Sequence, residues 1–222
     1  MHTSVTEKNL HSRSRAVQSE YRKQQLIEAT LDCIDKLGLS QTTIARIAER
    51  AGVSQGIVVF HFQTKKNLLE QTLRHLSQEY MQCWQDACEL ASPDPVPQLC
   101  AMIKAAFTPA ICNRKKISVW FAFWGESRSR PMYMELCGNN DQAYSGKILS
   151  LCAEIKVKSK SPLSAQTAAL SIEGTIDGLW QNFLIATLGF KRRQAITTVF
   201  ELLEIIYPEE DQNIRQFAAS SV

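Results

Sequence analysis

The segment Thr42–Leu69 constrains the fold more than any other part of this sequence, because it predicts three short helices in close succession. Thr42 and Thr43 are suited to cap the first helix, since a threonine hydroxyl accepts a hydrogen bond from an unpaired backbone amide. One apolar face of that helix is formed by residues at i, i+3 and i+4, namely Ile44, Ile47 and Ala48. Gly52 then ends the pattern, because glycine permits a positive φ.

A second short helix is expected after Ser54 as its N-cap, carrying Ile57 inward, and Thr64 is expected to start a third. Two short helices at a steep angle around a turn of small residues are typical of a helix-turn-helix, which presents one helix to the major groove of DNA. Three core helices of an ordinary helical domain are the alternative interpretation.

The same segment resembles the TetR family of bacterial transcriptional repressors, whose motif is roughly T-x-x-x-I-A-x-x-A-G-V-S-x-G-x-x-x-x-x-F-x-x-K-x-x-L. The matching residues are Thr43, Ile47, Ala48, Ala51, Gly52, Val53, Ser54, Gly56, Phe62, Lys65 and Leu68. Val59 stands where the family commonly has tyrosine, so His61 and Phe60 are the candidates for the phosphate contact of that tyrosine.

The expected second helix, Ser54–Phe62, contains neither lysine nor arginine. It therefore lacks the bidentate arginine–guanine contact that is the commonest specific contact in the major groove. Gln55 can pair with adenine, and the outward-facing members of Ile57–Val59 can touch thymine methyl groups. We therefore expect a half-site biased toward A·T pairs, read by Gln55, Phe60 and His61.

Phosphate contacts are expected from Thr43 and Lys65, because both stand at helix N-termini, where backbone amides and the helix dipole favour anions. Four upstream cations can enter a narrow minor groove, with a merely solubilising tail as the alternative: Arg13, Arg15, Arg22 and Lys23. The candidate DNA-binding residues are Thr43, Ser54, Gln55, Gly56, Phe60, His61 and Lys65.

Charge and composition agree with a DNA-binding head on a different body. Residues 1–66 contain 10 Lys and Arg against 6 Asp and Glu, a net +4, whereas the remainder contains 15 against 16, a net −1.

The N-terminal 20 residues have no apolar run, and the uncharged stretch Gly178–Phe190 is too short for a bilayer span of about 20 residues. The seven cysteines include no C-x-x-C pair, which indicates reduced buried thiols. We expect a cytoplasmic protein without a metal or cofactor.

The hydrophobic periodicity predicts an all-α fold in four parts. Residues 1–18 are expected to form a flexible basic tail, 19–66 the helix-turn-helix DNA-binding domain, 67–207 a helical ligand-binding and dimerisation domain, and 208–222 a C-terminal tail. Within these parts the first helix is expected to stop at Gly38, a long helix to begin at Thr64, and others to follow near 97–113, 114–128, 131–157, 162–189 and 191–206.

The body carries an aromatic run in which Trp120, Phe123 and Trp124 share one helix face. Trp180, Tyr133 and Tyr144 add further rings. Such a stripe is more often core than binding site, but clustered aromatic faces also bind quaternary ammonium groups, at about 0.5–2 kcal/mol per ring. A carboxylate at such a site would come from Glu126, Asp177 or Glu173. The candidate ligand-binding residues are Trp120, Phe123, Trp124, Tyr133, Trp180 and Asp177.

Motifs over about residues 20–206 are similar to those of the choline-responsive BetI-type repressors: RKQQLIEATLDCI at 22–34, TIARIAERAGVSQGIV at 43–58, WFAFWG at 120–125, RPMY at 130–133 and IDGLW at 176–180. This resemblance implies a homodimer on a near-palindromic operator, which controls genes for choline uptake and for the conversion of choline to glycine betaine, with choline as the effector. A TetR-family repressor of a multidrug efflux system, which senses larger lipophilic cations, is the alternative.

Two apolar segments, 164–189 and 191–206, are expected to form a four-helix interface with a second copy, because small residues allow close helix approach. These small residues are Ala168, Ala169, Ser171 and Gly174. An enzyme is not expected, since the histidines (His2, His11, His61 and His75) stand in no catalytic context and no phosphate-binding loop appears. A ligand-binding module without DNA binding is the remaining class.

Overall fold

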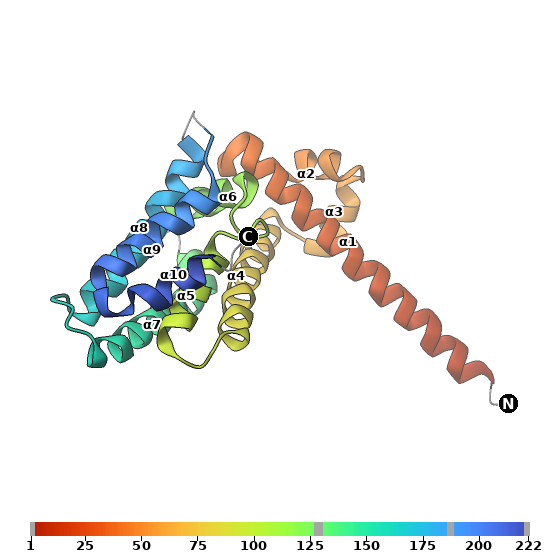
Figure 1. Ribbon diagram of the computed structural model, residues 1–222. Coiled ribbons are helices and arrows are strands. Elements are labelled where there is room, and N and C mark those ends of the chain that lie inside the picture. Colours follow the sequence, from red (N-terminus) through yellow and green to blue (C-terminus); the bar gives the residue numbers. More distant parts are fainter. Residues whose placement is uncertain (1–2, 127–130, 186–188, 220–222) are drawn as a thin grey trace. The chain divides into compact units, whose positions relative to one another are not determined.

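The computed structural model describes the backbone of residues 3–126, 131–185 and 189–219, with side chains from Arg15 onward except those of Glu126 and Ala219. The described secondary structure is helical throughout, which confirms the predicted all-α class (Figure 1). The chain divides into two compact units, residues 1–73 and 74–222. No helix in the described ranges is long and apolar enough to cross a membrane.

The first unit contains α1 (Thr3–Gln41), α2 (Ile44–Ala51), α3 (Gln55–Phe62) and the start of α4 (Lys65–Leu90). Its core joins the inward faces of the four helices through Leu26, Ile27, Ala29, Cys33, Ile47, Ala48, Val58, Phe62 and Leu68. Gly52 closes α2 in the left-handed region, at φ 65°, as its position in the turn predicts.

Three expectations for this unit need correction. Residues 3–18 continue α1 instead of forming a flexible tail; no Gly or Pro precedes Gly38, so nothing interrupts propagation of the helix. Thr42 is buried and donates to the Gly38 carbonyl oxygen, so Thr43 alone caps α2. Val58, rather than Ile57, points into the core, because it shares a face with Phe62 four residues later.

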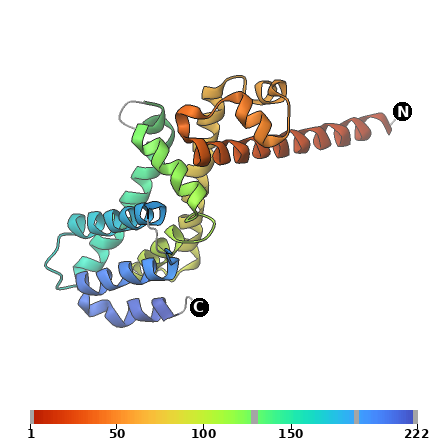
Figure 2. The same ribbon diagram turned by 90° about the horizontal axis from the view of Figure 1, so that it is seen from above.

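The second unit continues α4 and adds α5 (Pro95–Ala106), α6 (Arg114–Glu126), α7 (Pro131–Lys158), α8 (Ala165–Ile185), α9 (Arg192–Ile206), the 3-10 turn η1 (Pro208–Glu210) and α10 (Asp211–Ala219). Helix α7 packs against α5 and α8, and α9 packs against α8. Figure 2 shows α9 and α10 side by side at the end of this unit. The division between units follows Leu73 rather than residue 66, within the continuous helix α4.

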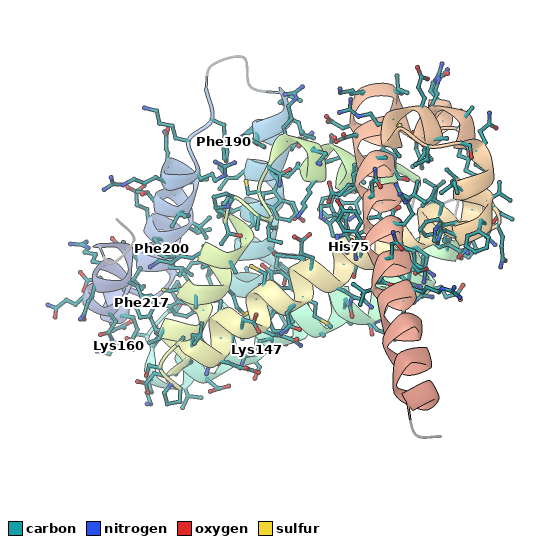
Figure 3. The ribbon with its side chains drawn as sticks, turned by 90° about the vertical axis from the view of Figure 1, so that its right-hand side faces the viewer. His75, Lys147, Lys160, Phe190, Phe200 and Phe217 are labelled. Carbon is teal, nitrogen blue, oxygen red and sulfur yellow. The ribbon has the colours of Figure 1, made fainter. Side chains whose placement is uncertain are left out.

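The C-terminal segment is a helix rather than the expected tail. Helix α10 packs against α5 and α9, and its Ile214 is buried. Lys104 of α5 donates a hydrogen bond to the Phe217 carbonyl oxygen. The Lys104 ammonium also lies 5.9 Å from the ring centre of Phe200 and 5.0 Å from that of Phe217, the two rings labelled in Figure 3. These contacts join α5, α9 and α10.

The small residues of α8 divide between two environments. Ala168 and Ala169, which were expected at a dimer interface, are buried within the single chain. Gly174 is exposed, and a Cβ atom built on it meets no other atom within 4 Å. The seven cysteines are free thiols, all buried except the half-buried Cys83.

Candidate ligand cavity and DNA-binding surface

A cavity of about 230 Å³ lies among α4, α6, α7 and α8 within the second unit. It is lined by Ser77, Tyr80, Met81, Trp84, Trp120, Trp124, Tyr133, Asn140, Asp141, Tyr144, Ser145, Glu173, Ile176, Asp177 and Trp180. Seven of these residues are aromatic, and they include all four tryptophans of the chain.

The aromatic rings form two groups that meet at Trp180. Trp124 lies nearly parallel to Trp180, with 6.2 Å between ring centres and 10° between ring planes. Trp120 lies 6.1 Å from Trp124, and Tyr80 lies 5.5 Å from Trp180 on the other side. Tyr144 continues this second group, 5.3 Å from Tyr80. The cavity therefore has aromatic faces on several of its sides.

Hydrogen bonds hold the indoles in place. Trp180 donates through Nε1 to the Ala106 carbonyl oxygen at 3.0 Å. Trp124 donates through Nε1 to the Tyr133 hydroxyl at 2.6 Å, and that hydroxyl donates to Asp141 Oδ2 at 3.2 Å. Because both indole N–H groups are satisfied by protein atoms, a guest in the cavity meets ring faces rather than donors of these two indoles.

Three carboxylates line the same cavity. Asp141 accepts from Tyr133, and Glu173 accepts from the Ser145 hydroxyl at 2.5 Å. Asp177 is exposed as a residue, yet the protein atoms around its carboxyl group reduce the hydration of that group. This loss of hydration, reinforced by the charges of Glu173 and Asp141, raises the pKa of Asp177 to about 6. Burial also raises the pKa of Asp141.

No lysine, arginine or histidine is among the residues that line the cavity. A carboxyl group whose pKa is raised by two neighbouring carboxylates, with no basic partner in the lining, belongs to a site that favours a cation. No group of three or more His, Cys, Asp or Glu side chains in the described ranges is arranged to hold a metal ion. The cavity is therefore suited to an organic cation with apolar surface.

The sequence-predicted ligand residues separate into two sets. The structure brings Trp120, Trp124, Tyr133, Trp180 and Asp177 to the cavity. Phe123, three residues after Trp120, is 1% exposed and does not line the cavity, because its side chain points into the core. The Glu126 side chain lies outside the described ones.

Sequence reasoning missed several lining residues as ligand candidates. Tyr80 and Trp84 lie on the long helix expected to begin at Thr64 but are not among the candidates, and Tyr144 is named above only as a further ring. Asp141 was not considered, although its spacing of eight residues from Tyr133 places both on one helix face. Helical spacing gives the face of each residue but not which of the packed faces encloses a void.

The helix-turn-helix presents an exposed surface on α3. Thr43 caps α2 by accepting from the Arg46 amide at 3.3 Å, whereas the Ser54 side chain caps no amide of α3. Gln55 and Gly56 are exposed. Lys65, half-buried, is the first residue of α4.

Phe60 and His61 lie in the last turn of α3, on this exposed surface. Phe60 is 77% exposed, and its ring contacts the His61 ring edge-on, with 5.1 Å between centres. Partial burial, followed by the positive charges of Lys23 and Arg22 on α1, lowers the pKa of His61. The His61 imidazole therefore lies beside an exposed phenyl ring and within the electrostatic influence of two cations, an arrangement suited to a polyanion that also offers apolar groups.

Comparisons with known proteins cover both units. Residues 26–72 match the family of bacterial regulatory proteins called tetR, and residues 95–207 match the C-terminal domain of BetI-type transcriptional repressors. The HTH-type transcriptional regulator BetI of Yersinia pestis (strain Pestoides F) is 36% identical over 82% of this chain and 91% of its own length. The BetI of Paraburkholderia xenovorans (strain LB400) is 34% identical over 84% and 94%.

Two solved structures share the fold. A transcriptional regulator from Pseudomonas aeruginosa PAO1 has a TM-score of 0.72 at 25% identity and covers 89% of this chain and 94% of its own. A regulator from Saccharomonospora viridis, solved in complex with choline, has a TM-score of 0.72 at 22% identity and covers 84% and 96%.

Proposed function

This chain belongs to the TetR family of bacterial regulators and carries a BetI-type repressor domain, and from that premise we propose that choline is its effector. The chain is a transcriptional regulator rather than an enzyme. We further propose that it represses genes for choline uptake and for the conversion of choline to glycine betaine, from a near-palindromic operator.

The observation that carries the choline proposal is the combination of seven aromatic residues and three carboxylates around one cavity without a basic side chain. A trimethylammonium group cannot donate an N–H hydrogen bond, so aromatic faces and unpaired negative charge are the groups that attract it. The choline complex of the Saccharomonospora viridis regulator supports the same ligand class for this fold.

We assign the cation to the space bordered by Trp124, Trp180 and Asp177. The two parallel indoles offer ring faces, and the Asp177 carboxylate lies one turn before Trp180 on α8. Glycine betaine has the same ammonium group but carries a carboxylate, which Asp141 and Glu173 would repel. The cavity is therefore expected to prefer choline to glycine betaine.

Repression from a near-palindromic site requires two heads, and we propose that α8 and α9 pair with those of a second copy. Leu170 of α8 is 70% exposed and Ile205 of α9 is 75% exposed. Gly174 follows Leu170 by one turn of α8 and leaves room for a close approach. Apolar surface of this kind stays in contact with water unless a partner covers it.

The test is a titration of choline followed by intrinsic fluorescence, since every tryptophan of the chain lines the cavity. We expect a saturable change with choline, a weaker response to glycine betaine, and loss of at least tenfold in affinity for Trp180→Ala and for Asp177→Asn, consistent with a desolvated cation–π contact and ion pair of about 1.4 kcal/mol or more. Phe183→Leu, on the same helix as Asp177 and Trp180 but outside the lining, is the matched control.

Two results would contradict the choline assignment. Equal affinities of the Asp177→Asn variant and the unaltered chain would remove the carboxylate from the site. Binding of tetrabutylammonium without any response to choline would instead favour a repressor of an efflux system that senses larger cations.

A further inference from the structure

The outward face of α3 is apolar. Val58 and Phe62 are 1% and 3% exposed and anchor the helix in the core of the first unit. On the opposite side Phe60 is 77% exposed, and the flanking Val59 and Ile57 are 45% and 39% exposed. This face therefore ends in an unshielded phenyl ring.

Positively charged residues lie around this apolar face but not within it. Helix α3 contains neither lysine nor arginine. Arg22 and Lys23 on α1 lie near enough to His61 to lower its pKa, and Lys65 follows at the start of α4. A duplex that meets this surface can place its phosphates against the flanking cations, so the apolar centre faces base edges in the major groove.

The only apolar group on a base edge in the major groove is the C5 methyl of thymine. We infer that Phe60 reads this methyl group, so that the operator half-site requires a thymine at a position fixed by Phe60. The inference rests on the proposed repressor function and adds the base chemistry that the head recognises. Gln55 precedes Phe60 by five residues, a rise of about 7.5 Å, so an adenine paired with Gln55 lies about two base-pair steps from that thymine.

A different role for the ring predicts a different dependence on the DNA. If the Phe60 ring packed against deoxyribose, as a substitute for a phosphate-contacting tyrosine, its removal would weaken all duplexes to the same extent. If the ring contacts a methyl group instead, its removal weakens only duplexes that carry that methyl group at one position. Replacing thymine with deoxyuracil removes that methyl and keeps the base pair.

The experiment begins with selection of duplexes from a random pool by the unaltered, full-length chain. Each thymine of the selected half-site is then replaced by deoxyuracil, and affinities are measured at fixed salt. We expect one position at which the replacement weakens binding about fourfold, which corresponds to about 0.8 kcal/mol for one buried methyl group. Phe60→Ala should bind thymine and deoxyuracil duplexes with equal, reduced affinity.

Two variants are the controls. Leu37→Ala, an exposed apolar residue of α1 outside this face, should keep the fourfold difference, and Phe60→Leu should keep part of it. Both sites are exposed, so folding is expected to be retained, and circular dichroism checks it.

The possible outcomes distinguish loss of the methyl contact from loss of the repressor function. Equal binding of thymine and deoxyuracil duplexes by the unaltered chain, or a full difference in Phe60→Ala, overturns the methyl contact and leaves the repressor function standing. Selection of no duplex overturns the repressor function and this inference with it.

Discussion

Asp177 lies one helical turn after Glu173 on α8, and its pKa of about 6 lies well above its ordinary value of 3.8. The folded chain therefore holds a proton that the unfolded chain has already released between these pH values. Its contribution to the free energy of unfolding is greatest below pH 3.8 and is lost as the pH rises through about 6. A bound cation favours the ionised carboxylate, so ligand and proton compete for this residue.

This competition gives a pH dependence that we expect to measure by choline titration between pH 5 and pH 8. With a pKa of about 6, roughly one Asp177 in eleven is ionised at pH 5, so the apparent affinity should fall about tenfold from its value at pH 8. Asp177→Asn should bind weakly at both values, with most of the difference gone. A tenfold fall that persists in the variant would assign the titration to Asp141 instead.

At the residue scale, spacing alone predicted part of the cavity. Trp120 and Trp124 were identified because residues four apart share a helix face, and both reach the cavity. Phe123 satisfies the same rule and is buried in the core instead. The difference depends on how α6 is rotated against α7 and α8, which is a property of packed helices rather than of one helix.

At the element scale, the end of a helix at a glycine was easier to predict than the start of a short, polar helix. Gly38 was expected to end the first helix, and it adopts φ 76° there. Helix α10 was missed because it is short, mostly polar and preceded by Pro208. Its stability comes from packing, since isolated helices of this length are marginal in water.

The packing of α10 predicts a large effect for Ile214, which is 1% exposed. We expect Ile214→Ala to lower the free energy of unfolding by about 2–5 kcal/mol, because it removes buried methyl groups and leaves a cavity. Val157→Ala, at a site 85% exposed, should change it by less than about 0.5 kcal/mol. Urea unfolding of both variants is the measurement, and equal stabilities would mean that α10 contributes little to the fold.

At the scale of the whole molecule, α4 belongs to both units. It begins at Lys65, directly after the helix-turn-helix, and its Tyr80 and Trp84 line the cavity. A ligand that changes the helix at Tyr80 acts on a continuous element that enters the DNA-binding unit. If choline weakens operator binding by some factor, operator DNA must weaken choline binding by the same factor.

Assembly gives the prediction at this scale. The exposed Leu170 of α8 should lie between two copies, so Leu170→Glu is expected to convert a dimer to monomers and to reduce operator affinity at least tenfold. Sedimentation velocity checks the mass, with Val157→Glu on exposed α7 surface as the control. A Leu170→Glu chain that still sediments as a dimer would move the interface away from this part of α8.

The unbalanced charge of the cavity also has a consequence for how the sequence can change. The charges of Glu173 and Asp141 disfavour ionisation of Asp177 in the empty chain, and a neutral replacement of either neighbour that fits relieves this effect. At these positions, mutations that stabilise the fold therefore weaken binding of the cation, and residues that bind the cation lower the stability of the fold. Selection for detection has to maintain the acidic residues against a continuing supply of more stable, unresponsive variants.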